Sequence, residues 1–180
     1  MGQEKEDPVL EDEGILLKRM DEDDTENIIR WRNTEFVRRN FIYQNPFTNK
    51  GHENWIREMI RTGKAVQFMI VRKDLGEPVG SVYLRDIDRT HNKAEYGIFI
   101  GEKDAIGRGY GTRAAKLMIR YGFETLGLHK LMLRVLAENI PAIKSYEKAG
   151  FVREAYLKDE VFLDGQYKDV VYMAVIKFGS

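Results

Sequence analysis

The sequence contains no cysteine, carries no net charge and has no long apolar run, and each absence excludes a class of protein. Without cysteine there are no disulfides, thiolate metal ligands or cysteine nucleophiles. Lys and Arg together number 29, as do Asp and Glu, so no general attraction to nucleic acid or anionic membranes is expected. No apolar stretch approaches the roughly 18 residues that span a bilayer, and the acidic first residues do not resemble a secretory signal. We therefore expect a cytoplasmic protein without nucleic-acid or membrane partners.

What the chain does have is enough apolar material for a folded core, since 43% of its 180 residues are hydrophobic. Residues 1–13 are acidic and offer little to bury, so we expect a disordered tail there and a single domain over 14–180. The strands expected from the apolar periodicity are 15–17, 66–72, 79–85, 94–100, 131–137, 161–163 and 167–176, and the expected helices are 24–33, 50–62, 109–125 and 140–149. This order predicts an α/β fold with a mixed, mostly antiparallel sheet flanked by helices.

Glycines at alternate positions mark the segment 106–112, between a predicted strand and a predicted helix. Such glycines let a backbone bend tightly and bring its N–H groups close to an anion, and a helix N-terminus adds free donors. A phosphate site and a plain turn both fit this spacing. The Gly-Lys-Ser/Thr ending of a P-loop is absent. The dinucleotide pattern is met by Gly109, Gly111 and Ala114, but about eight residues separate it from its strand, which disfavours a nicotinamide or flavin enzyme.

This loop resembles the acetyl-CoA pyrophosphate loop, Q/R-x-x-G-x-G/A, of the GCN5-related N-acetyltransferase (GNAT) family. In the same order, 94–100 resembles the family's splayed strand, and 139–151 resembles its N-x-x-A-x-x-x-Y-x-x-x-G-F segment. Residues 164–169 are similar to the hairpin of the branch that contains ribosomal-protein, polyamine and amino-sugar acetyltransferases. The resemblance covers 14–176. It implies the GNAT fold, acetyl-CoA as co-substrate and no metal.

The resemblance also implies which residues contact acetyl-CoA. They are Phe99, Ile100, Ile106, Gly107, Arg108, Gly109, Tyr110, Gly111, Thr112 and Asn139. The backbone of Phe99 and Ile100 would pair with the pantetheine arm as if it were an added strand. Asn139 would contact that arm, cap the helix 140–149, or do both. Ile106 departs from the family pattern because it occupies the position that is usually Gln or Arg. We expect at most a modest loss of affinity for acetyl-CoA, because backbone N–H groups make most of the contacts with the pyrophosphate and Arg108 can compensate.

Two residues are candidates for the chemistry of acetyl transfer to an amine. Tyr146 stands where the resembling family carries the tyrosine that donates a proton or hydrogen bond to the departing thiolate. Glu95 is the candidate base, because a lysine-like amine titrates near 10.4 and must lose a proton before it attacks. The alternatives are a tyrosine that packs within its helix and a strand carboxylate that is ion-paired or faces solvent.

The sequence leaves the acceptor open. A protein N-terminus, as in ribosomal-protein acetylation, an amino sugar and a polyamine all remain. A polyamine site should be acidic, whereas 30–62 carries several arginines and no acidic cluster, which fits an anionic acceptor better. Trp31-Arg32-Asn33 is similar to a W-R-N segment of nucleotide-sugar acetyltransferases and of other members of this branch, although helix packing with solvated arginines is the favoured explanation.

Three further expectations accompany this interpretation. The three histidines are too far apart in sequence to predict a metal site, and His52 is expected at the surface. A homodimer through the C-terminal hairpin is possible by family analogy. The alternative from another class is a non-catalytic acyl-CoA-binding module that keeps the glycine loop and has lost the chemistry.

Overall fold

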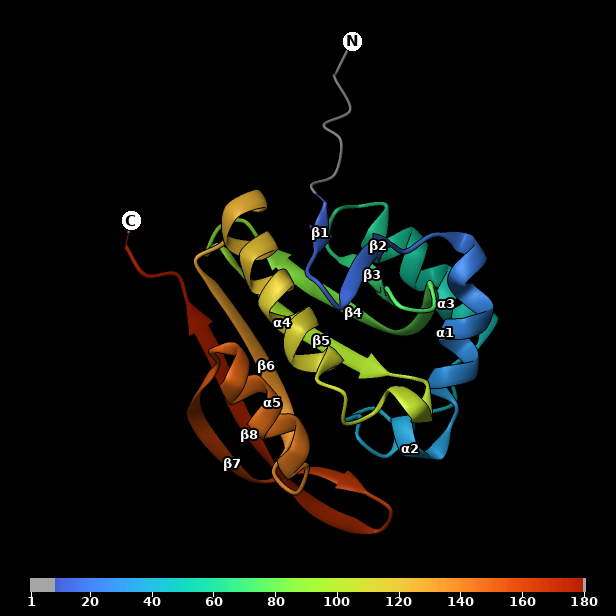
Figure 1. Ribbon diagram of the computed structural model, residues 1–180. Helices are drawn as coiled ribbons and strands as arrows, with labels where there is room; N and C mark the ends of the chain where they lie inside the picture. The colour runs from blue at the N-terminus through green and yellow to red at the C-terminus, as the bar shows by residue number, and fades with distance from the viewer. Residues whose placement is uncertain (1–8, 180) are drawn as a thin grey trace.

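One mixed β-sheet organises the molecule, whose computed structural model describes residues 9–179 (Figure 1). Within these residues eight strands lie in the order β1-β2-β3-β4-β5-β6-β8-β7, and neighbours are antiparallel except for β5 and β6. The strands are β1 (Leu10–Glu11), β2 (Ile15–Arg19), β3 (Val66–Arg72), β4 (Glu77–Asp88), β5 (Lys93–Ile100), β6 (Lys130–Leu136), β7 (Val152–Leu163) and β8 (Gln166–Ile176). The expected mixed, mostly antiparallel α/β fold is confirmed.

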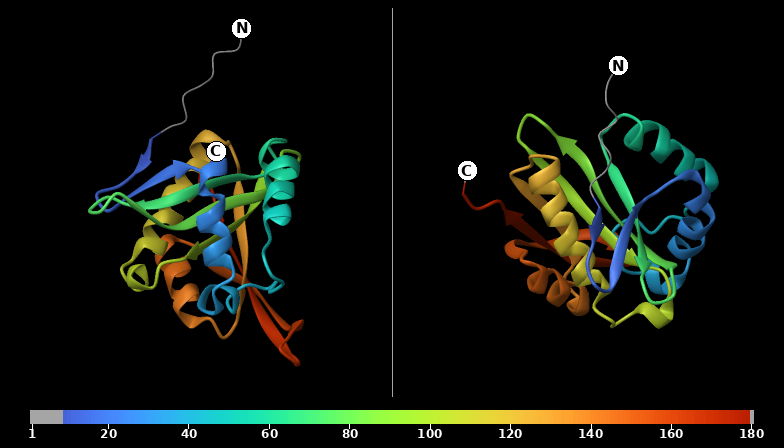
Figure 2. Two further views of the ribbon diagram at one scale, coloured as in Figure 1. Left: turned by 90° about the vertical axis from the view of Figure 1, so that its right-hand side faces the viewer. Right: turned by 45° about the horizontal axis from the view of Figure 1, so that its top comes forward.

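Helices cover both faces of the sheet (Figure 2). One face carries α1 (Thr25–Arg32), α2 (Glu35–Arg38) and α3 (Asn49–Trp55), and α3 continues into a π-helical turn at Ile56–Ile60. The opposite face carries α4 (Tyr110–Arg120), with a π-helical turn at Tyr121–Thr125, and α5 (Ile140–Ala149). Short 3₁₀ turns at Glu22–Asp24 and Lys103–Ala105 precede α1 and the loop before α4.

Side-chain alternation along the strands builds a separate core on each face of the sheet. On β3, Phe68 and Ile70 join the core beneath α4, whereas Met69 and Val71 pack beneath α1–α3. The second core centres on Trp31, which is fully buried and meets the ring of Phe99 edge-on with a centroid distance of 6.3 Å. Each residue of a central strand such as β3 or β5 therefore faces one of two helical layers, and this decides to which side of the site it can contribute.

The N-terminal boundary of the domain lies earlier than expected. Leu10 is only 3% exposed and pairs with Leu17, so the described part of the predicted tail includes strand β1. The Asp12 carboxylate accepts hydrogen bonds from the Gly14 N–H (2.8 Å) and from Arg113 of α4 (2.9 Å), which ties this segment to the helical layer. The prediction of disorder is thus wrong for residues 10–13. Residues 1–8 lie outside the described residues.

Two further expectations need correction. β7 begins at Val152 rather than at 161. Its first part was missed in the sequence because β7 is an edge strand whose side chains are mostly exposed and carry no alternating apolar pattern. His52 is buried rather than exposed, and its Nδ1 lies 3.0 Å from the Thr25 hydroxyl, so it joins α3 to α1. The remaining predicted strands and helices are found within a few residues of their expected bounds.

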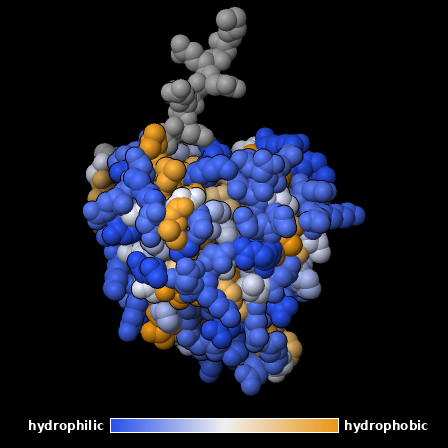
Figure 3. All heavy atoms as spheres, turned by 45° about the vertical axis from the view of Figure 1, so that its right-hand side comes forward, coloured by the Kyte–Doolittle hydropathy of each residue, from blue (hydrophilic) through white to orange (hydrophobic). Residues whose placement is uncertain are grey.

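The outer surface is predominantly polar on the side that carries α1–α3. In Figure 3 hydrophilic residues dominate this side and apolar residues are scattered among them. The β7–β8 hairpin extends beyond the body of the molecule (Figure 1) and exposes the aromatic side chains of Tyr156, Phe162 and Tyr167. Among residues 9–179, no helix combines the length and the apolar character needed to cross a bilayer.

Candidate active site

A cavity opens where the two parallel strands separate. β5 and β6 pair only from Lys93 to Glu95 on one strand and from Lys130 to Met132 on the other, and beyond these residues they diverge. The cavity between them has a volume of about 630 Å³, within the range typical of small-molecule sites. Beyond Glu95 no strand of residues 9–179 pairs with the inner edge of β5, so its backbone is available to an extended ligand.

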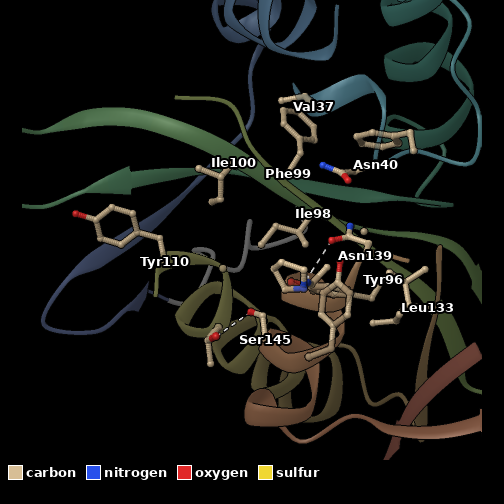
Figure 4. Close-up of a pocket in the computed structure, with 18 of the residues that line it drawn as sticks. Val37, Asn40, Tyr96, Ile98, Phe99, Ile100, Tyr110, Leu133, Asn139 and Ser145 are labelled. Carbon is tan, nitrogen blue, oxygen red and sulfur yellow. Dashed lines mark hydrogen bonds between the residues drawn. The ribbon is translucent and has the colours of Figure 1, made fainter. Parts of the chain in front are cut away.

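The diverging strand gives the cavity two ends. Phe99 points toward Val37 and Asn40 of the α1–α3 layer, whereas Ile98 and Ile100 point to the opposite side (Figure 4). We call one part the acceptor end; it is lined by Phe36, Val37, 40–43, Tyr83, Arg85, Glu95 and Arg134. The part lined by Ile98, Ile100, the loop 105–112 and α5 is the cofactor end. The two ends meet at the point where β5 leaves β6.

At the cofactor end the glycine loop adopts the left-handed conformation that its sequence predicts. Gly107 has φ +77° and Gly109 has φ +81°. A Cβ atom at either position would meet nothing within 4 Å, so the backbone conformation rather than lack of space requires glycine. Gly109 is the N-cap of α4 and supplies no side-chain cap, which leaves the first N–H groups of α4 free for an anion.

Most of the predicted cofactor residues come together at this end. Those that line the cavity are Phe99, Ile100, Ile106, Gly107, Gly109, Tyr110, Gly111, Thr112 and Asn139. Arg108 does not, because its Nε donates to the carbonyl oxygen of Asp104 (2.6 Å), so nothing here supports its expected compensation for Ile106. The Thr112 and Ser145 hydroxyls lie 2.8 Å apart and join the start of α4 to the middle of α5. Asn139 Oδ1 accepts from the Ala142 N–H (3.4 Å), as expected of a helix cap.

Tyr146 projects from α5 into an aromatic cluster at the cofactor end. Its ring lies edge-on to Tyr96 and to Phe151, with centroid distances of 6.0 Å in both cases. Burial, with a smaller contribution from Tyr83, raises the pKa of Tyr146 well above its ordinary range. The phenol therefore stays protonated near neutral pH and can donate a hydrogen bond into the cavity that it lines.

Sequence reasoning missed Tyr96 and Tyr83. Tyr96 is 3% exposed, and its hydroxyl is buried without a hydrogen-bond partner among the described residues. The Tyr83 ring covers Gly97 so closely that a Cβ there would lie 2.2 Å from a ring carbon. Tyr96 could have been flagged by its place beside Glu95 in the quoted strand, but the contact of Tyr83 with Gly97 depends on the register between β4 and β5.

Glu95 lies at the acceptor end between two arginines that sequence reasoning also missed. Arg85 Nη2 donates to Glu95 Oε2 (3.2 Å), and Arg134 Nη2 donates to Glu95 Oε1 (3.3 Å). Arg85 is the register partner of Glu95 on β4, and Arg134 comes from β6, so only strand pairing brings the three together. The ion-paired alternative for Glu95 is therefore realised, while its carboxylate still lines the cavity.

In the Trp31-Arg32-Asn33 segment the first and last side chains form hydrogen bonds, whereas Arg32 has no hydrogen-bond or ion-pair partner within residues 9–179. The Trp31 indole donates to Glu102 (2.7 Å), and the Asn33 side chain bonds both the N–H and the carbonyl of Phe47 (2.9 and 2.8 Å). Arg32 stacks over Phe41, with 3.7 Å from its guanidinium carbon to the ring centroid.

Comparison with known proteins places these features in a family. Residues 15–152 match the family model described as an acetyltransferase (GNAT) domain. The chain is 43% identical over 102 residues to spermidine N(1)-acetyltransferase of Escherichia coli K12, and 30% identical over 102 residues to the putative ribosomal N-acetyltransferase YdaF of Bacillus subtilis. These matches cover 57% of this chain in both cases, and the chain spans only about half the length of these curated relatives, 54% and 55%.

A solved structure extends the similarity to nearly the whole fold. The crystal structure of spermidine N-acetyltransferase from Vibrio cholerae in complex with CoA and spermine superposes with a TM-score of 0.83 at 27% identity. This superposition covers 90% of the present chain and 95% of the other.

Proposed function

Because the chain belongs to the GNAT acetyltransferase family, we propose that it is an acetyl-CoA-dependent N-acetyltransferase that moves an acetyl group to a primary amine. The family resemblance in the sequence is thereby confirmed. The observation that carries the proposal is the cavity at the divergence of β5 and β6, which has the glycine loop at one end and Glu95 at the other.

Acetyl-CoA fits the cofactor end by its chemistry. The unpaired edge of β5 offers the backbone of Phe99 and Ile100 to the pantetheine amides. The free N–H groups at the start of α4, with Gly107 and Gly109, suit the pyrophosphate. Lys144 and Lys148 of α5 line the same region and add positive charge for phosphate.

The two catalytic candidates lie on opposite faces of β5, as the reaction requires. An amine that enters from the acceptor end loses a proton to Glu95, directly or through water, and its nitrogen attacks the thioester carbonyl. The new C–N bond forms, the C–S bond breaks, CoA leaves as a thiolate, and the nitrogen loses its second proton to water to give the neutral amide. Tyr146 at the cofactor end donates a hydrogen bond or proton to that sulfur. Orientation of the amine and thioester supplies much of the remaining rate enhancement.

The acceptor is a primary amine, either a protein N-terminus such as that of a ribosomal protein or a small molecule. The similarity to YdaF supports the first class. The similarity to spermidine acetyltransferases supports a polyamine, and the Trp31-Arg32-Asn33 segment supports an amino sugar. The cytoplasmic location and the homodimer stay predictions. The aromatic residues exposed on the β7–β8 hairpin support that dimer, and sedimentation would test it.

Thermal unfolding with acetyl-CoA, CoA and NAD at saturation tests the co-substrate. A ligand present at about 100 times its Kd stabilises the folded state by roughly 2.7 kcal/mol, which raises the Tm by several degrees. We expect this shift with both CoA species and none with NAD. Release of CoA on addition of a primary amine then separates an enzyme from a non-catalytic acyl-CoA-binding module. No shift with either CoA species would refute the proposal.

A further inference from the structure

Arg32 does not itself line the cavity, but its guanidinium stacks on Phe41 and Phe99, which do, and no acidic side chain of the described residues neutralises it. It is partly buried and stacks over three aromatic rings, with 3.7 Å to Phe41, 4.8 Å to Phe47 and 5.9 Å to Phe99. Its Nε is buried without a hydrogen-bond partner, and it forms no ion pair within residues 9–179. Burial lowers the pKa of Arg32, and the charge of Arg85 lowers it further against the opposing effect of Tyr83. Such a cation gains free energy from an added anion.

The charges that line the cavity are mostly positive at both its acceptor end and its cofactor end. Among the described lining residues the cations are Arg85, Arg134, Lys144 and Lys148, and the one carboxylate is Glu95. Two of these cations already share that carboxylate, so the acceptor end keeps an excess of positive charge even before Arg32 is counted. A polyamine that entered here would meet like charges, and like charges that face each other at short range repel.

Aromatic side chains complete the walls of this end. Phe36, Phe41 and Tyr43 line the cavity beside Asn40, and Phe41 carries the Arg32 guanidinium on its ring. Arginine held on an aromatic plane keeps its in-plane N–H donors free for a bidentate contact with a carboxylate or phosphate.

Resting on the proposed function, we infer that the acceptor is a primary amine that carries a phosphate or carboxylate, and that Arg32 and Arg85 hold this anionic group while the amine reaches Glu95. The enzyme would thus select its acceptor by the negatively charged group at the end opposite to the reacting amine. Spermidine, the substrate named for similar proteins, lacks such a group.

Matched acceptors test the inference with wild-type protein and acetyl-CoA. The phosphate arm compares glucosamine 6-phosphate with glucosamine, the carboxylate arm compares 4-aminobutyrate with 1,4-diaminobutane, and spermidine is included as the polycation. We expect kcat/KM to be at least tenfold higher for the anionic member of one or both pairs, and the arm that responds identifies the anion. The inference is overturned if the neutral or cationic members, spermidine included, have an equal or greater kcat/KM. It is also overturned if neither anionic acceptor is acetylated.

The same experiment separates this failure from failure of the proposed function. If acetyl-CoA raises the Tm and a neutral or cationic amine releases CoA, the enzyme assignment stands and only the anionic acceptor is wrong. If no CoA species raises the Tm and no amine releases CoA, the proposed function fails and the inference falls with it.

Variants then test the role of Arg32 directly. Arg32→Gln should raise KM for the anionic acceptor about tenfold or more, leave KM for acetyl-CoA unchanged and reduce the preference over the uncharged partner, while Arg32→Lys should restore part of that preference. Arg57→Gln, at an exposed arginine after α3, is the matched control and should change none of these values. Arg85→Gln provides a second test should Arg32→Gln not fold. An unchanged preference in the folded variants overturns the inference, because a merely structural role would affect both acceptors equally.

Discussion

Removal of two tyrosine hydroxyls in the same aromatic cluster should affect different properties of the protein. The Tyr146 hydroxyl makes no hydrogen bond to a described residue, and its side chain lines the cavity. The Tyr96 hydroxyl is buried and has no hydrogen-bond partner in the described part of the chain. Replacing each by phenylalanine leaves the ring packing in place and deletes a single oxygen. Tyr146→Phe should therefore affect turnover, and Tyr96→Phe should affect stability.

The expected magnitudes follow from these surroundings. Loss of a proton donor at the leaving group lowers kcat by about 10² or more, equivalent to roughly 2.7 kcal/mol of activation free energy. Since Tyr146→Phe leaves no partner unsatisfied, the free energy of unfolding should change by less than about 0.5 kcal/mol. An unpaired buried hydroxyl costs about 1–3 kcal/mol, so Tyr96→Phe should stabilise the fold by about 1 kcal/mol. That corresponds to a rise in Tm of roughly 2–4 °C for a domain of this size.

The composition makes the assay simple. Because the chain has no cysteine, a thiol reagent detects only the CoA that is released. Both variants should keep the acetyl-CoA-induced rise in Tm, which shows that the co-substrate still binds. Wild-type kcat in Tyr146→Phe would remove this residue from the mechanism. An equal loss of kcat in both variants would show that the cluster acts through packing, and destabilisation by Tyr96→Phe would contradict the unpaired hydroxyl.

Three further perturbations address the loop, the N-terminus and the buried histidine. Gly109→Ala forces alanine to φ +81° and should cost about 1–2 kcal/mol of stability and severalfold in acetyl-CoA affinity. Gly63→Ala, at φ +72°, should lose similar stability but no affinity, and equal affinity in both would refute an anion-binding loop. Leu10→Ala should cost about 2 kcal/mol in urea unfolding, whereas no change would restore the disordered-tail prediction. Burial lowers the pKa of His52 below 6.5, so the unfolded state binds more protons than the folded state as pH falls below about 6.5, and stability is lost. Between pH 7.5 and 5.5, urea unfolding should therefore show a larger loss of stability for wild type than for His52→Asn. Equal losses in the two proteins would contradict this.

Local sequence patterns were sufficient to predict the bounds of strands whose side chains alternate between two buried or half-buried environments. β3 was predicted with its observed bounds, Val66–Arg72, since its apolar run ends at turn residues on both sides. β7 lacks such a pattern: its first nine residues lie at the edge of the sheet and are mostly exposed, so only its pairing with β8 defines it. β1 is a two-residue strand that gains its order from Leu10 and from the bond of Asp12 to Arg113, a hundred residues away.

The residues of the site likewise divide into those that local sequence patterns predict and those that only the folded sheet brings together. The glycine loop, Asn139 and Tyr146 could be placed at one cavity because each belongs to a contiguous segment with its own turn or cap signal. The arginines around Glu95 could not, since they come from β4 and β6 and meet only through strand register. That no described residue forms an ion pair with Arg32 is likewise a property of the folded chain, although the sequence already suggested an anionic acceptor through the arginines of 30–62.

The break in the sheet joins these observations. β6 pairs with β8 along its whole length, from Lys130 with Ile176 to Leu136 with Val170, and β5 pairs with β4 as far as Ile100. Each strand is thus held on its outer side, and the inner edges separate after only three residue pairs. Backbone groups along that gap lack the partners that a continuous sheet would supply, so an extended amide ligand gains free energy there. The same gap connects the two faces of the sheet. Under the proposed function, a thioester bound beside α4 and α5 would therefore meet there an amine that enters beside α1 and α2.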